Sequence, residues 1–498
     1  MSDAYHELAR SFARMAALGE AGGMLNWDAQ VMMPSGGAEA RSEQLAALDV
    51  TAHEMLTDAR AGELLDRAEA DSAGLDGWQR ANLAEMRRQW QHAHAVPSAL
   101  VEALTRATRR CEMVWREAKP DSDFARVKPY LSEVLRLVRE QATAKGEALG
   151  LSPYDALLDQ FEPGMRAARV SEVFDDLAAF LPGFLDDVLR HQAAGPVPER
   201  PQGPFPQAKQ EALAAQLMHT LGLEAANSRL DTSSHPFTGG VPEDIRITAR
   251  WDESDFTTGV MAVIHETGHA LYERGLPDAW RRQPVGEARG MALHESQALL
   301  AEMQVSRGEH FLRHAAPVMR DALGGSGSAW EPDNLHRLAT RVEPGYIRVD
   351  ADEVTYPAHV ILRYRLETAL ISGDMPLDEL PGAWNAGMRE LLGITPPEDR
   401  LGCLQDIHWF DGGWGYFPTY TLGAIAGAQL YRAACTAEPG IPSYLERGDV
   451  SPLLSWLREN VHQLGASLST DEILRRATGR GFDVEAFKGH LRERYLAP

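Results

Sequence analysis

The chain has 498 residues, and its apolar and charged fractions are those of an ordinary soluble globular protein with a large core. It carries 49 basic and 72 acidic side chains, a formal net charge of −23, which disfavours nucleic acid and anionic lipid as partners. The three cysteines form no C-x-x-C pair, so we expect neither a disulfide framework nor a cysteine zinc cluster. The amino terminus lacks an apolar signal core, and no stretch approaches the ~20 apolar residues of a membrane span, so we predict a cytoplasmic protein with no membrane partner.

The first part of the chain is predicted to be almost entirely helical. Residues 3–20, 38–150 and 170–192 show apolar positions at helical spacing, with charged residues on the opposite face. Such helices pack as a bundle or as long hairpins. Trp27 is most simply a core anchor, and Asp28 a helix cap or a salt-bridge partner.

A proline-rich segment follows these helices. Residues 194–206 contain five prolines, which forbid regular structure there. This segment is the best candidate for a linker; the alternative is a stretch that simply crosses a cleft. We expect a helical amino-terminal half, residues 1–193, and a second half, residues 207–498, that contains the histidine pattern described below and is therefore the catalytic half of one unit over residues 1–498.

The only convincing strand pattern lies at residues 244–251, where polar and apolar residues alternate. The edge of such a strand can hydrogen-bond a peptide backbone. A small, purely structural sheet explains the pattern equally well. The strand leads directly into the segment with the strongest chemical signal.

That segment contains His265, Glu266 and His269, an H-E-x-x-H pattern. Positions four apart lie one turn apart on the same face of a helix, so both imidazoles can point at one metal ion, and Glu266 can reach a water on it. The alternative is a pair of solvated histidines on an amphipathic helix. Residues 257–264 and 270–272 are mostly apolar or small, however, and a buried helix must give each polar group a partner. The pattern therefore indicates a zinc-peptidase site.

A third metal ligand is expected from a second helix, predicted at residues 291–303. Glu295 lies 26 residues after His269, far enough for a turn and a returning helix. A catalytic zinc needs three protein ligands and one open position, so we assign Glu295 as the third ligand. His294 is the rival, but it faces another direction, and Glu302 is assigned a structural role.

Several stretches in the last third of the chain are typical of pocket walls. Residues 345–356, 402–409 and 412–420 mix aromatic, glycine and hydrogen-bonding residues without clean periodicity. Residues 420–498 return to ordinary helices, one of which opens with good capping residues at 470–473.

Six short motifs occur in order along the chain. They are His235-Pro236-Phe237, Asp244-x-Arg246-x-Thr248, His265-Glu266-x-x-His269, His294-Glu295-Ser296-Gln297, Ile347-Arg348-x-x-Ala351-Asp352 and Gly402-x-x-Gln405-Asp406-x-His408-Trp409. From about residue 24 to the carboxyl terminus, the chain resembles the carboxypeptidase Taq family of metallocarboxypeptidases, peptidase family M32. Pro357 and the pair Phe410-Asp411 depart from the form typical of that family, which leaves the local pocket shape and the side-chain preference open.

The resemblance implies a mainly α fold: a large helical peptidase with a deep substrate groove and one small β-sheet next to the HExxH helix, similar to neurolysin-like zincins. It implies a homodimer. It also implies the removal of single residues from the free carboxyl termini of peptides, with broad preference and poor action at proline.

The expected chemistry is zinc-dependent hydrolysis. One zinc ion per chain, or cobalt or another divalent metal in its place, is held by His265, His269 and Glu295. Glu266 accepts the proton of the attacking water and delivers it to the leaving amine. Candidates for a second oxyanion donor, which the sequence does not rank, are Tyr420, Tyr416 and His408.

An exopeptidase must also recognise the α-carboxylate of its substrate, a task suited to the bidentate fork of arginine. We assign Arg348, with Gln405 and Arg246 as possible helpers. The alternative for Arg348 is an ion pair with Asp350 or Asp352.

Two other functions compete with this hypothesis. A zinc endopeptidase or oligopeptidase shares the metal site but lacks the carboxylate clamp. A non-catalytic, metal-stabilised binding protein is disfavoured, because Glu266 is present and no fourth protein ligand is apparent.

Overall fold

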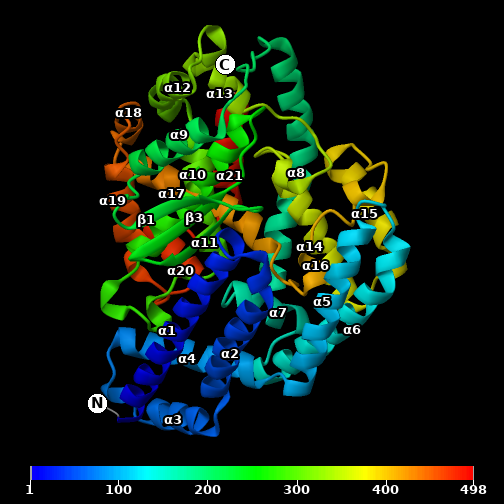
Figure 1. Ribbon diagram of the computed structural model, residues 1–498, viewed down its shortest axis with the longest axis vertical. Coiled ribbons are helices and arrows are strands. Elements are labelled where there is room, and N and C mark those ends of the chain that lie inside the picture. Colours follow the sequence, from blue (N-terminus) through cyan, green and yellow to red (C-terminus); the bar gives the residue numbers. More distant parts are fainter. Residues whose placement is uncertain (1–2, 497–498) are drawn as a thin grey trace. The chain divides into compact units, whose positions relative to one another are not determined.

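The computed structural model describes residues 3–496 and shows a mainly α protein with one small sheet, which confirms the predicted fold class (Figure 1). The chain divides into two compact units that alternate along the sequence. Unit 1 comprises Met1–Trp90, Pro198–Ala339 and Ala426–Asp483, and unit 2 comprises Gln91–Val197, Thr340–Ile425 and Val484–Pro498. Each unit thus draws on both of the predicted halves, and the proline-rich segment contains one crossing between the units.

Unit 1 contains the sheet and most of the shorter helices. Its helices are α1 (Asp3–Val31), α2 (Ala38–Thr57), α3 (Ala59–Ala70), α9 (Gln207–Thr220), α10 (Phe256–Gly275), α11 (Met291–Leu299), α12 (Glu309–Leu323), α13 (Pro332–Ala339), α18 (Ile441–Leu445), α19 (Ser451–Asn460) and α20 (Thr470–Thr478). Two helices continue from one unit into the other: α4 (Gly77–His94) and α17 (Pro418–Ala437).

Helix α1 is longer than predicted. It continues to Val31, so the predicted end at residue 20 is wrong. The later turns pack against α2, and this packing overrides the weak helix propensity of the glycines they contain. As predicted, Trp27 is buried and Asp28 is an ion-pair partner, at 2.7 Å from Arg41.

The sheet has three strands, β1 (Ser228–Thr232), β2 (Phe237–Val241) and β3 (Asp244–Ala249), in the order β1-β3-β2. Strand β1 runs parallel to β3, and β2 runs antiparallel to it, with Thr238 opposite Ile247. The strand pattern seen in the sequence is thus the middle strand, whose two edges are both paired, so it cannot hydrogen-bond a peptide. The outer strands are short, polar or rich in glycine, which hid them from the pattern.

The sheet packs on α10, as predicted for the HExxH helix (Figure 1). Ile245, Ile247 and Ala249 of β3 are buried, and so are the apolar residues Val260, Val263 and Ile264 of α10. This apolar contact fixes the helix that carries the HExxH pattern. After α11 the chain widens into a π-helical stretch, Leu300–Ser306, in which every residue is buried. Such stretches often occur at functional sites.

Within the described residues, the regular elements of unit 2 are all helices. Its helices are α5 (Ser98–Ala118), α6 (Phe124–Leu149), α7 (Pro153–Phe161), α8 (Ala167–Ala194), α14 (Tyr356–Ser372), α15 (Leu380–Leu392), α16 (His408–Asp411) and α21 (Val484–Tyr495). Helices α5 and α6 form a long hairpin, and α14 packs on α7, α8 and α15. Pro357 lies in the first turn of α14, where a missing N–H costs no hydrogen bond, so this departure from the family form is accommodated.

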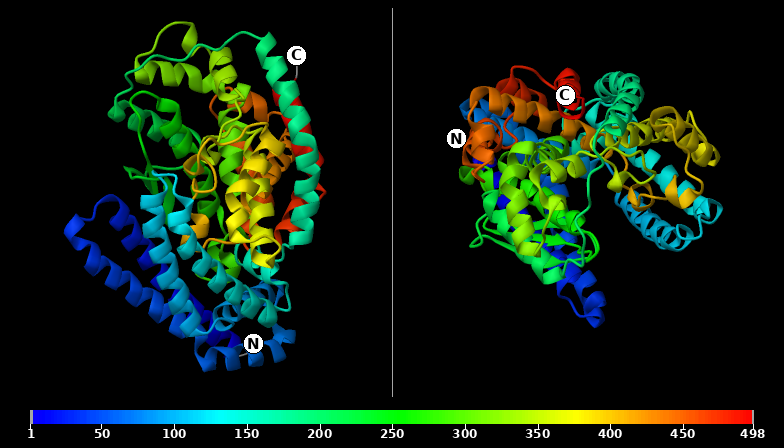
Figure 2. Two further views of the ribbon diagram at one scale, coloured as in Figure 1. Left: turned by 90° about the vertical axis from the view of Figure 1, so that its right-hand side faces the viewer. Right: turned by 90° about the horizontal axis from the view of Figure 1, so that it is seen from above.

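The carboxyl-terminal helix α21 lies along α8 (Figure 2, left view). The buried carboxylate of Glu353 holds it through three contacts: His490 Nε2 at 2.8 Å, Arg494 Nη1 at 2.9 Å and the Tyr495 hydroxyl at 3.0 Å. Across residues 3–496, every helix is too short or too polar to cross a membrane.

Candidate metal centre

Helix α10 places His265 and His269 one turn apart on the same face of the helix. Asp255 caps its start, where the side chain accepts a hydrogen bond from the Thr257 N–H. The helix packs against α11 at very close range, because Gly268 has no side chain: a Cβ there would lie 2.5 Å from the main-chain oxygen of Gln297. This close packing places Glu295 of α11 opposite the two histidines.

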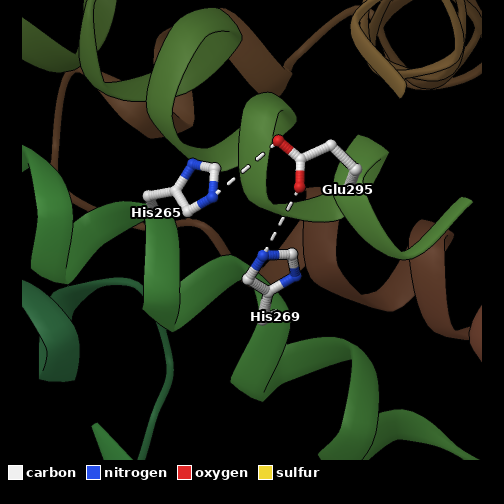
Figure 3. Close-up of side chains that lie close together, drawn as sticks. All are labelled: His265, His269 and Glu295. Atoms are coloured by element: carbon white, nitrogen blue, oxygen red, sulfur yellow. Dashed lines mark ion pairs between the residues drawn. The ribbon is translucent and has the colours of Figure 1, made fainter. Parts of the chain in front are cut away.

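Three donor atoms converge between α10 and α11 (Figure 3). His265 Nε2 lies 4.0 Å from Glu295 Oε1, and His269 Nε2 lies 3.7 Å from Glu295 Oε2. These separations are too long for hydrogen bonds and are close to those of donors that share one ion. Taken one per residue, the ligand atoms of His265, His269 and Glu295 lie within 4.8 Å of one another. Two imidazoles and one carboxylate make up a ligand set of catalytic zinc, so the residues fit a divalent metal.

The electrostatics of the site also favour a cation. Burial lowers the pKa of His265, but the hydrogen bond with Glu302 and the charges of Glu295, Glu302 and Glu266 outweigh it and raise that pKa to about 10. Burial raises the pKa of Glu295. Burial, with the charges of His294 and His265, holds the pKa of His269 well below its usual value, so this imidazole is neutral. The carboxylates of Glu266, Glu295 and Glu302 outnumber the one guanidinium that contacts them, that of Arg307, and this excess stabilises a positive charge at the point of convergence.

Glu302, which lies in the π-helical stretch, orients the first histidine. Its Oε2 lies 2.9 Å from His265 Nδ1, and its Oε1 accepts a hydrogen bond from Arg307 at 2.6 Å. This contact directs His265 Nε2 toward Glu295, in the way that carboxylate partners commonly orient metal-binding histidines. The predicted role of Glu302 is structural only, so this contact was missed. The signal for it in the sequence is the spacing of seven residues from Glu295, on the same side of the helix.

His294, the rival ligand in the sequence analysis, is not among the converging donors. Its Nε2 lies 2.8 Å from Glu273 Oε1, and its ring stacks on His269 with centroids 4.5 Å apart. The His294 side chain therefore packs against His269, one of the proposed ligands, and is not itself a ligand.

Glu266 is buried and has one oxygen held in place. The hydroxyl of Thr238, in the edge strand β2, lies 2.7 Å from Glu266 Oε2 and 2.9 Å from the main-chain oxygen of the same residue. Oε1 has no hydrogen bond or ion pair among the residues that the structure describes, and it is the oxygen left for a water. The sequence analysis did not single out Thr238, although it directly follows the His235-Pro236-Phe237 motif.

Arg246 lies in unit 1, in the middle strand β3. Its guanidinium carbon stacks 4.3 Å above the Trp27 ring, and its Nη2 lies 2.8 Å from Asp244 Oδ2. The side chain is thus held by two neighbours of the same unit.

Arg348 lies in unit 2 and pairs with Asp406, whose Oδ1 lies 2.9 Å from Arg348 Nη2. The alternative ion pair with Asp350 or Asp352 is wrong. Asp352 instead accepts main-chain N–H groups, including that of Thr355, where its carboxylate caps a turn. Gln405 supports the loop of Arg348: its Oε1 accepts the Arg348 N–H at 2.8 Å.

The three candidate oxyanion donors form one aromatic cluster in unit 2. The Tyr420 hydroxyl lies 3.4 Å from His408 Nε2, and the Tyr416 and Tyr420 rings are 5.2 Å apart. Burial, the largest effect, lowers the pKa of His408 to about 4, so the imidazole is neutral near pH 7. Arg348 stacks on Tyr420 at 4.8 Å.

Phe410, which departs from the family form, is buried and stacks on Trp115.

Known proteins resemble this chain over nearly its whole length. The model of the family described as carboxypeptidase Taq (M32) metallopeptidase matches residues 7–495. Thermostable carboxypeptidase 1 of Thermus thermophilus is 36% identical over 99% of this chain and 98% of its own length. Carboxypeptidase 1 of Bacillus subtilis is 33% identical over 97% and 96%. Among solved structures, Trypanosoma cruzi metallocarboxypeptidase 1 matches with a TM-score of 0.97 and 39% identity over 99% of both chains. An M32 carboxypeptidase from Deinococcus radiodurans R1 matches with a TM-score of 0.92 and 32% identity over 100% of both chains.

Proposed function

Because the chain belongs to the carboxypeptidase Taq (M32) family of metallopeptidases, we propose that it removes single residues from peptide carboxyl termini with one zinc ion. Family membership makes the chain a metallocarboxypeptidase, a hydrolase of peptide bonds that requires a divalent metal. The observation that carries the proposal is the convergence of His265, His269 and Glu295 on one point beside the carboxylate of Glu266. Zinc is favoured over cobalt by availability, since the ligand set suits both.

Glu266 has the position of a general base. When bound, the metal would polarise the scissile carbonyl and lower the pKa of a water near it. Glu266 Oε1 takes the proton of the attacking water and returns it to the leaving amine nitrogen. Thr238 keeps the carboxylate in place through Oε2, so the proton is held at a defined atom. The buried site raises the strength of each of these contacts.

The oxyanion needs a donor besides the metal, and we propose that Tyr420, Tyr416 or His408 supplies it. The phenol groups of Tyr420 and Tyr416 and the neutral imidazole of His408 can each donate one hydrogen bond. The mutual contact of Tyr420 and His408 supports a shared role.

Recognition of the substrate carboxylate is assigned to Arg348, with Gln405 and Arg246 in supporting roles. The guanidinium is buried, is held on one side by Asp406 and stacks on aromatic rings, so it is pre-organised for a bidentate contact. The proposal includes the broad side-chain preference, the poor action at proline and the homodimer that the family resemblance implies.

A mixture of peptides of known sequence, incubated with the purified protein with and without a chelator, tests the function. Ladders that shorten one residue at a time from the carboxyl terminus, and that disappear on chelation, are expected in mass spectra. Elemental analysis of the same preparation identifies the metal and its ratio to the chain. Internal fragments, or equal cleavage of peptides with an amidated carboxyl terminus, would instead show the endopeptidase of the alternative hypothesis.

A further inference from the structure

Two arginines in unit 2 share one carboxylate. Arg348 Nη2 lies 2.9 Å from Asp406 Oδ1, and Arg363 contacts Asp406 Oδ2 through Nε at 2.6 Å and Nη2 at 2.5 Å. The side chains of Arg348, Asp406 and Arg363 are 6%, 13% and 0% exposed. This arginine cluster, which consists of Arg348, Arg363 and Asp406, therefore holds two positive charges and one negative charge away from water.

The neighbouring groups do not balance the extra charge. Within residues 3–496, neither arginine has a second carboxylate partner. The buried imidazole of His359 is neutral, because burial and the two arginines lower its pKa to about 3. Glu367, one turn beyond Arg363 on α14, accepts its hydrogen bonds from Tyr154, Trp409 and the Gly415 N–H instead.

Lys119 adds to the positive charge. Its Nζ donates to the main-chain oxygen of Gln405 at 2.8 Å, and it interacts with the charge of Asp406. A buried excess charge is costly unless a ligand or a partner completes it. The cluster thus favours an anion.

The two arginines differ in what they can still bind. Arg363 is enclosed: it donates through Nη1 to the main-chain oxygen of His359 and lies 4.5 Å from the Trp384 ring. Arg348 uses Nε and Nη2 on Asp406, and its Nη1 makes only a long contact of 3.3 Å with the Tyr356 hydroxyl. Arg363 Nη2 also lacks a hydrogen bond, but its side chain is fully buried, whereas that of Arg348 is 6% exposed. A ligand can therefore reach only Arg348.

We propose that Arg363 is a positioning residue for substrate selection: it balances Asp406, so that Arg348 keeps a net positive charge for the α-carboxylate of the peptide. This inference rests on the proposed role of Arg348. Without Arg363, the Arg348–Asp406 pair is neutral, and the fields of its two charges largely cancel at a bound carboxylate. Arg363 therefore sets the affinity for a free carboxyl terminus without touching the substrate.

Arg363→Met tests this, because it removes the charge and keeps most of the buried volume. We expect KM for peptides with a free carboxyl terminus to rise roughly 10- to 100-fold, with kcat changed less than about threefold. Arg363→Lys, which keeps the charge, is expected to keep KM within a few-fold of the parent. Arg365→Met is the matched control, because Arg365 lies on the same helix in exposed pairs with Asp175 and Glu390.

The decisive measurement is a charge rescue. The double variant Arg363→Met with Asp406→Asn restores the net charge of the cluster, so its KM is expected to return most of the way to the parent value. A purely structural role for Arg363 predicts the reverse, since the second change removes another buried contact. Thermal unfolding of each variant accompanies the kinetics.

An unchanged KM in Arg363→Met, or no recovery in the folded double variant, overturns the inference. If Arg363→Met does not fold, the test rests on the double variant and on Arg363→Lys. A KM raised in both of these variants also overturns the inference. Arg348→Met separates this failure from failure of the proposed function. If Arg348→Met leaves KM for free carboxyl termini unchanged, the assignment of Arg348 is wrong. If it raises KM while Arg363→Met does not, only the role of Arg363 is wrong.

Discussion

The metal centre of unit 1 and the arginine cluster of unit 2 are both buried and both unbalanced in charge, but with opposite sign. Around His265 and His269, the carboxylates of Glu266, Glu295 and Glu302 outnumber the one guanidinium that contacts them, that of Arg307 on Glu302. In the arginine cluster, two guanidinium groups share Asp406, and a negative charge is missing. The sign of the missing charge fits the ligand proposed for each place: a divalent cation in one and a substrate carboxylate in the other.

A third cluster shows what a balanced arrangement looks like. Glu353 is as deeply buried as the other carboxylates, but Arg494, His490 and Tyr495 of α21 surround it. It needs no ligand and holds the carboxyl-terminal helix in place. All three clusters are buried, so burial alone does not mark a functional site. Burial together with an unbalanced charge is the feature that the metal centre and the arginine cluster share and Glu353 lacks.

The strongest loss of activity is expected at the acidic metal centre. Glu266→Gln removes the base and keeps the shape, so kcat should fall by about 10³-fold or more, while bound metal stays near the parent level. Thr238→Val provides a graded control: it removes the hydroxyl that contacts Oε2 and the main-chain oxygen of Glu266 but keeps the carboxylate, and about a tenfold loss of kcat is expected. Steady-state kinetics on a single peptide measure both. Turnover that survives in Glu266→Gln would exclude this carboxylate as the base.

The balanced cluster should respond in stability and not in activity. Glu353→Gln breaks a buried ion cluster, and about 3 kcal/mol of unfolding free energy should be lost at pH 7. Glu485→Gln, at a more exposed pair with Lys488 on the same helix, should cost less than about 0.5 kcal/mol. Urea unfolding checks both values, and an equal loss in the two variants would contradict the assignment.

The stability lost in Glu353→Gln should depend on pH. Burial raises the pKa of Glu353, but the charges of Arg494 and His490 outweigh it and hold that pKa well below its usual range. The stabilisation is therefore present above the unfolded-state pKa of about 4.3 and is lost as the pH falls below it. The difference between parent and Glu353→Gln should shrink as the pH is lowered from 5 to 3. A difference that stays constant would show that packing, not charge, stabilises this helix.

The smallest expected effect concerns the orientation of a proposed ligand. Glu302→Gln should weaken zinc binding by about 10- to 100-fold, because the carboxylate no longer orients and polarises His265. Competition with a chromophoric chelator measures this without reference to activity. Glu309→Gln, at a more exposed pair with Arg313, is the control and should leave the zinc affinity unchanged.

Local sequence patterns predicted the helical fold and the chemistry of the metal helix. Helical periodicity and the spacing of His265 and His269 depend on neighbours within one or two turns, so they can be read along the chain. The strand at residues 244–249 was visible for the same reason. The end of α1 and the strands β1 and β2 were missed, because their stability comes from packing and pairing with distant segments.

The residue types proposed for the chemistry could be read from the sequence: the HExxH histidines, a carboxylate between them and arginines suited to a carboxylate. Their contact partners depend on the folded structure. Thr238 and Glu266 lie 28 residues apart, His265 and Glu302 lie 37 apart, and Arg348 and Asp406 lie 58 apart. No local pattern couples residues at such separations, because their contact depends on how whole helices and strands pack. The charge balance of each site was therefore settled by the packing.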